Sequence, residues 1–314
     1  MKVNPVLKKE LMLGSRTIRF PIALMCYGLC MAAISLLMVF SAVNVSGAAD
    51  FANLTSIFLV LAFVQMGLIL LIIPVLTAGS IAGERERQTL DLLLTAPVSS
   101  FSVILGKLLS SMCNVLLYIF VSLPAMAMAF LYGGIQWRYL AVFLVMILVT
   151  AFFCGAVSIW CAAQFKKTIL SIVVSLLWEF VFFGGTLIMV VGVYSWRYLQ
   201  WNQAVAAGTL SSSSSVSMGW IPVILLLNPA VGFADAMSST YSSVNLMNQI
   251  LNGGSLGTLA QGLIRLSPHW SLFGFAVTVA VGMLFLVLAA RKLNTARKKD
   301  KFFQPAKKKG RRRA

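Results

Sequence analysis

Charged residues are scarce in this chain. Only 11% of the 314 residues are Asp, Glu, Lys or Arg, whereas 60% are hydrophobic. Soluble domains carry about 25% charged residues. A water-soluble fold would therefore have too little polar surface to cover itself, and intrinsically disordered chains are much poorer in apolar residues. The composition predicts a membrane protein.

The residues that build common metal and catalytic sites are also scarce. The sequence has one histidine, His269, and five cysteines that form no Cys-x-x-C pattern. This spacing argues against a zinc site and against a disulfide framework. The chain also lacks the His-Glu-x-x-His and Gly-x-Ser-x-Gly motifs of hydrolases. We therefore expect neither an enzyme nor a bound cofactor or metal.

Long apolar runs, in contrast, are abundant. A helix that crosses a bilayer needs about 20 mostly apolar residues. Six stretches meet this requirement: 20–43, 54–78, 101–131, 139–164, 168–194 and 269–290. The run 220–234 is shorter and contains Pro222 and Pro229, so we expect a re-entrant or embedded segment there. The sequence predicts an all-α polytopic fold with one transmembrane domain over residues 20–290.

The positive charges give this fold an orientation. With six spans, 22 of the 25 basic residues fall on the side of both termini, and only Arg138, Arg197 and Arg265 fall on the other. The positive-inside rule makes the first side cytoplasmic. The tail, residues 291–314, holds 12 of these basic residues. Because basic residues are attracted to anionic lipids, we expect the tail to be a disordered arm on the membrane surface. Binding to nucleic acid is the weaker alternative, because the tail has few aromatic residues that could stack on bases.

Two further regions lie outside the spans, one before the first span and one between the fifth and sixth. Residues 1–19 begin with Asn4-Pro5, a helix-start pattern, and predict an interfacial helix, although a frayed polar terminus is the alternative. The outer segment 195–268 starts with aromatic residues and contains the serine run 211–215. Leucines at helical spacing predict an amphipathic helix within 256–266.

The most polar cytoplasmic stretch before the tail follows the second span. Glu84 lies in the first turn after a glycine, and its spacing to Arg87, and that of Arg87 to Asp91, would let these pairs meet on a helix surface. Pro97 would end this helix. The pattern predicts a short amphipathic helix over 84–96. It could transmit force from a soluble partner or merely connect two spans.

This stretch resembles a segment of ABC-2 type permeases, the membrane subunits of bacterial ATP-binding-cassette exporters. The resemblance rests on an acidic-basic-acidic cluster, a threonine, a leucine-rich turn, a proline and the downstream pair Gly106-Lys107. It implies that the chain lies in the bacterial plasma membrane and that 84–96 is a coupling helix that docks on a separate ATPase subunit. The coupling positions it implies are Glu84, Arg85, Glu86, Arg87, Thr89, Asp91, Leu93 and Pro97.

The ATPase itself would be a different polypeptide. A P-loop needs Gly-x-x-x-x-Gly-Lys-Ser/Thr so that backbone amides cradle the phosphates. The pair Gly106-Lys107 has Phe101 in place of the first glycine and Leu108 in place of the hydroxyl residue. We therefore expect ATP and magnesium to bind to separate P-loop ATPase subunits, and the permease to pair with a second copy or a related subunit.

One acidic residue lies well inside a span. Glu179 is eleven residues into the fifth span, where a charge costs about 2.5–3.5 kcal/mol on insertion scales. It marks either a transport pathway or a hydrogen bond between helices. A carrier driven by an ion gradient would need more such residues. That carrier and a non-transporting sensor or assembly module are the alternative functions.

Overall fold

The residues that the structure describes are 96% helical and contain no strand. The computed structural model describes residues 18–46, 51–86, 88, 100–133, 137–165, 167–209, 221–232 and 270–303. Its elements are α2 (Arg19–Ser46), α3 (Phe51–Glu86), α5 (Ser100–Gly133), α6 (Trp137–Gln164), α7 (Thr168–Phe180), the π-helix η1 (Val181–Gly185), α8 (Thr186–Ala206), the 3-10 helix η2 (Ile221–Leu227) and α12 (Trp270–Phe303). Among the described residues, six helices could cross a membrane by length and composition. The predicted all-α, six-span fold is confirmed.

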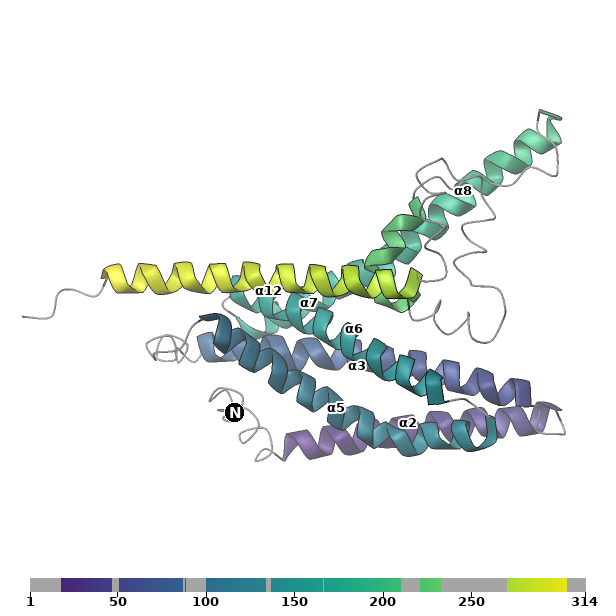
Figure 1. Cartoon of the computed structure of the whole chain (residues 1–314), viewed down its shortest axis with the longest axis horizontal. Coiled ribbons are helices and arrows are strands. Elements are labelled where there is room, and N and C mark those ends of the chain that lie inside the picture. Colours follow the sequence, from purple (N-terminus) through teal and green to yellow (C-terminus); the bar gives the residue numbers. More distant parts are fainter. Residues whose placement is uncertain are drawn as a thin grey trace, which may run out of the picture.

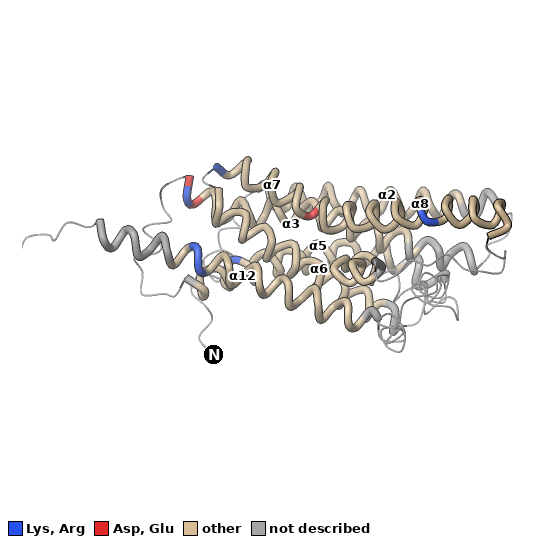
Figure 2. The backbone as a smooth tube through the Cα atoms, turned by 90° about the horizontal axis from the view of Figure 1, so that it is seen from above, with Lys and Arg blue, Asp and Glu red and all other residues tan. Residues whose placement is uncertain are grey.

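The helices run up and down in one elongated bundle (Figure 1). The start of α2, the end of α3, the start of α5 and the end of α12 all lie at the same end of the bundle. Most of the charged residues that the structure describes also gather there (Figure 2). We call this the charged end. The described part of the chain thus begins and ends at the charged end of the bundle.

Helix α3 packs against α5, α6 and α7, while α6 also packs against α12 and α2 against α5. The buried cluster that joins α3, α5, α6 and α12 contains many alanines, namely Ala78, Ala82, Ala156, Ala162, Ala163, Ala289 and Ala290. Small residues let helix backbones approach closely in a membrane. At Gly282 of α12 an added Cβ would lie 2.9 Å from Phe152 Cε1 and 3.6 Å from Phe153 Cα.

The fifth span is longer than predicted. Its helical run extends over Thr168–Ala206, 39 residues, and is interrupted only by the π-helical turn η1. The predicted end at residue 194 is therefore too early, because no proline follows to stop the helix. The aromatic residues placed in the outer segment instead belong to α8, where the Tyr198 ring stacks at 6.2 Å on Tyr194 and 5.9 Å on Trp201. Helix α8 leans away from the bundle (Figure 1).

The proline-interrupted segment is built into the protein. Element η2 packs against α12 and α8, and Leu225 and Leu226 are buried. Asn228, just after η2, donates hydrogen bonds from Nδ2 to Phe183 O and to Thr186 Oγ1, both at 2.8 Å. These bonds tie the segment to the π-helical turn of the fifth span.

The last helix also continues past its predicted end. Helix α12 runs to Phe303, so the first half of the tail is helical rather than disordered. No glycine or proline lies between Gly282 and Pro305 to end it. The remaining tail, the N-terminal helix, the serine run and the helix predicted within 256–266 lie outside the described residues, as does His269.

Candidate functional site

The second span does not end before Glu84. Helix α3 continues through Gly79 and Gly83 to Glu86. An added Cβ would lie 4.0 Å from Ile172 Cδ1 at Gly79 and 3.9 Å from Thr168 Oγ1 at Gly83. These glycines therefore face α7. Glu84 lies in the last turn of α3, so the prediction that it opens a separate helix is wrong.

Glu84 binds the start of α5. Its Oε2 lies 3.2 Å from Lys107 Nζ, and the Lys107 side chain is only 1% exposed. Lys107 Nζ also donates to the carbonyl of Ser80 at 3.0 Å. A buried ammonium needs such partners, because leaving a charge unpaired out of water is costly. The acidic cluster and the Gly-Lys pair, which are far apart in the sequence, thus meet in space.

Arg85 binds the end of α6. Its Nη1 donates to the carbonyl of Ala163 at 3.1 Å and to that of Phe165 at 3.2 Å. The last four carbonyls of a helix have no partner within the helix, and they carry its negative dipole end. A guanidinium group satisfies both demands. Arg85 therefore caps the C-terminus of α6.

Glu86 binds the start of α7. Its Oε2 accepts hydrogen bonds from Thr168 N at 3.1 Å and from Thr168 Oγ1. The residue at the N-cap position of α7, Lys167, provides no side-chain capping bond. A carboxylate at a helix N-terminus satisfies a free amide and meets the positive dipole end. Helix α7 therefore takes its cap from α3.

The chain turns directly after these residues. Gln88 has a φ of 59°, in the left-handed region that often ends helices. Its amide donates to the carbonyl of Arg85 at 3.1 Å. The other predicted coupling positions lie outside the described residues; they are Arg87, Thr89, Asp91, Leu93 and Pro97.

Three consecutive side chains at the end of α3 thus bind three different helices. We call Glu84, Arg85 and Glu86 the α3 clamp. Each of its contacts joins opposite charges or a charge and a helix end, so the four helix ends are held as one unit. Any force on the end of α3 would reach α5, α6 and α7 together.

Sequence reasoning identified the clamp residues but not their partners in the short connection between α6 and α7. The sequence feature that could have indicated these partners is the short connection itself. Helix α6 ends at Gln164 and α7 begins at Thr168, with only Phe165 and two lysines between them. An acidic and a basic residue side by side on α3 match these two opposite dipole ends.

Glu179 lies far from the clamp, on α7 within the membrane-spanning part. It is 4% exposed, and Ser158 of α6 lies at hydrogen-bond distance from its Oε1, 3.3 Å. Among the described residues, no three His, Cys, Asp or Glu side chains gather as a metal site would require. All five cysteines are free thiols.

Comparison with known proteins identifies the family. The family of ABC-2 family transporter proteins matches residues 66–296, which include the clamp, Glu179 and most of the helices. A comparison with curated proteins finds no match. ABC-2 permeases are membrane subunits that associate in general with ATP-binding subunits. The chain therefore belongs to the ABC-2 transporter family and is a multi-pass membrane permease of an ATP-binding-cassette transporter.

Proposed function

We propose that this chain is the permease of an exporter and that the α3 clamp couples a separate ATPase to the membrane helices. One observation carries the proposal: the clamp binds the start of α5, the end of α6 and the start of α7 at once. A displacement of the end of α3 would therefore shift several spans together. A loop that merely connects two spans would need no such contacts.

The ATPase would dock on the residues that follow the clamp. The family resemblance assigns this surface to Arg87, Thr89, Asp91, Leu93 and Pro97. ATP and magnesium bind to the ATPase, and its closure pushes the end of α3. The permease pairs with a second copy or a related subunit, so that two ATPases act on two clamps and move cargo outward.

The remaining features fit a bacterial plasma membrane. The charged end faces the cytoplasm, where the positive-inside rule places basic residues. Both termini then lie in the cytoplasm, and the basic tail binds anionic lipids.

The experiment separates docking from transmission. The permease is purified with its partner in mild detergent, and ATP hydrolysis is measured after reconstitution. Arg87→Ala with Asp91→Ala should lose the ATPase from the purified complex. Arg85→Gln should retain the ATPase but reduce permease-dependent ATP hydrolysis at least several-fold, because the end of α6 loses its bonds to the end of α3.

Arg197→Gln is the control, because Arg197 lies on α8, away from the charged end. This variant should change neither result. If no P-loop ATPase co-purifies with the wild-type chain, the proposed coupling to a separate ATPase fails in favour of a gradient-driven carrier or a non-transporting module. If Arg85→Gln leaves ATP hydrolysis unchanged, the clamp does not transmit force.

A further inference from the structure

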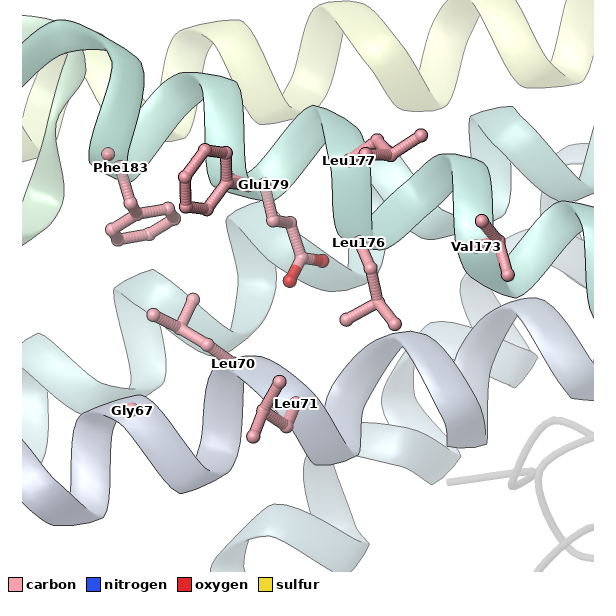
Figure 3. A pocket seen from close by; sticks show the side chains of 10 residues that line it. Gly67, Leu70, Leu71, Val173, Leu176, Leu177, Glu179 and Phe183 are labelled. Atoms are coloured by element: carbon pink, nitrogen blue, oxygen red, sulfur yellow. The ribbon is translucent and has the colours of Figure 1, made fainter.

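A cavity lies between α3 and α7 within the membrane-spanning part of the bundle. Its volume is about 640 Å³, within the usual range of small-molecule sites. Leucines and phenylalanines of α3, α7 and η1 form most of its wall, and Glu179 contributes the only ionisable side chain (Figure 3). Leu71 and Phe180, which also line it, are 59% and 64% exposed. The cavity therefore opens sideways, toward the lipid.

The Glu179 carboxyl group points into the space between the two helices (Figure 3). Its Oε1 lies 3.3 Å from Ser158 Oγ, whereas its Oε2 has no hydrogen-bond partner among the described residues. Ser158 has a single hydroxyl hydrogen, and its Oγ lies closer to Cys154 O, at 2.7 Å. Ser158 therefore shares its one hydrogen between Cys154 O and Glu179 Oε1.

Glu179 thus has one buried acceptor, Oε2, without a hydrogen-bond partner among the described residues. Glu179 lines an apolar cavity, where an unpaired polar atom costs free energy. A ligand with a hydrogen-bond donor would satisfy it. The rest of the wall would bury an apolar body, at about 25 cal/mol for each Å² removed from contact with water.

The shape of the cavity depends on the π-helical turn. Phe183 and Gly184 of η1 line it, and Phe183 O accepts the bond from Asn228 Nδ2 at 2.8 Å. Insertions of this kind in α-helices occur frequently at functional sites. The other end of α7 begins at Thr168, which binds Glu86 of the clamp. One helix thus joins the cavity to the charged end.

We propose that this cavity binds an apolar molecule that bears one hydrogen-bond donor, such as a hydroxyl group, and that such molecules are the transported class. The donor binds Glu179 Oε2, and the apolar body lies along Leu70 and Leu176. The transport part rests on the proposed function, whereas binding does not.

The binding test uses the isolated permease in detergent without any ATPase. The probes are 1-dodecanol and dodecyl methyl ether, which differ in the donor. We expect 1-dodecanol to raise the melting temperature of the wild type and of Glu179→Gln, which keeps the acceptor. Dodecyl methyl ether, which lacks the donor, should not raise the melting temperature of either protein. Glu179→Leu should abolish the shift.

Two glycine variants control for effects on the micelle. An added Cβ meets nothing within 4 Å at Gly67, which lines the cavity, or at Gly192 on α8, which does not. Gly67→Leu should fill the cavity and abolish the shift, whereas Gly192→Leu should retain it. An equal shift in both variants, or an equal shift with the ether, would overturn the binding site.

A second measurement tests Glu179 directly. Dicyclohexylcarbodiimide enters apolar sites and adds as a whole molecule to a protonated carboxyl group, forming an N-acylurea. We expect this mass on the peptide that contains Glu179, and less of it when 1-dodecanol is present. An unreactive Glu179 would overturn the proposal, because an apolar ligand could then not reach this carboxyl group either.

The source of a natural ligand is decided in the complex with its ATPase. Bound 1-dodecanol that leaves during ATP hydrolysis marks the cavity as a transport site. If 1-dodecanol stays bound through many rounds of ATP hydrolysis, such molecules are not the transported class, and the cavity is a site for a resident lipid. Failure of the ATPase to bind would refute the proposed function but leave the binding results intact.

Discussion

At the residue scale, the clamp contacts differ in how they stabilise the protein. The Glu84–Lys107 pair has one buried and one partly exposed side chain, 1% and 18% exposed. Removing one partner of a buried pair is strongly destabilising, while the intact pair adds little over apolar residues. This pair therefore fixes the position of α5 relative to α3 more than it adds stability. Glu86 acts differently, because it completes a helix end.

Glu86→Ala should lower the stability of the purified permease by about 1 kcal/mol, the usual effect of losing a helix cap. Amide hydrogen exchange should rise in the first turn of α7. Lys167 lies at the N-cap position with extended backbone angles, φ −95° and ψ 132°. Serine can cap a helix from that conformation, so Lys167→Ser in the Glu86→Ala background should restore stability and exchange protection.

The same pair of variants separates the two roles of Glu86. The double variant has a capped α7 but no bond between α3 and α7. If the bond transmits force, ATP hydrolysis in the complex should stay low in the double variant despite its restored stability. Recovery of wild-type hydrolysis would mean that Glu86 only caps the helix.

At the scale of elements, the approach of α12 to α6 depends on one small residue. Gly282 lies against the Phe152 ring and the backbone of Phe153. Gly282→Val should lower the melting temperature measurably, because overpacking costs about 1–3 kcal/mol. Gly192→Val makes the same change in a helix where an added Cβ meets nothing within 4 Å. It should have almost no effect; equal losses would mean that valine weakens any helix here.

The spans could be predicted from sequence because the bilayer requires long apolar runs. Their ends could not. Helices α3, α8 and α12 all continue past the apolar run, since no proline stops them and the polar residues that follow are compatible with a helix. The end of α3 also depends on contacts with other helices, such as that between Arg85 and Phe165, which local spacing does not reveal.

The candidate site could be predicted in part for the same reason. The polar cluster among apolar spans was visible in the sequence, and Glu179 was conspicuous as a charge inside a span. The unpaired oxygen of Glu179 was not, because it depends on where α3 lies relative to α7. The π-helical turn that shapes the cavity could not be predicted either, because no apolar periodicity in the sequence distinguishes it from an α-helix.

At the scale of the whole molecule, the charge distribution predicts an orientation that labelling can check. Lys292, in the second half of α12, and Gln200, on α8, are both exposed. In a variant without the five native cysteines, Lys292→Cys should react with an impermeant maleimide only in inverted vesicles. Gln200→Cys should react only in right-side-out vesicles. The reverse pattern would contradict the positive-inside assignment.

The clamp also bears on the order in which the chain assembles. Helix α3 precedes α6 and α7 in the sequence, so Arg85 and Glu86 are synthesised before the helix ends that they bind. The ribosome adds about 5–20 residues per second. Each later helix therefore finds its terminal partner already present when it enters the membrane. The binding groups on the second span are thus made before the fourth and fifth spans whose ends they hold.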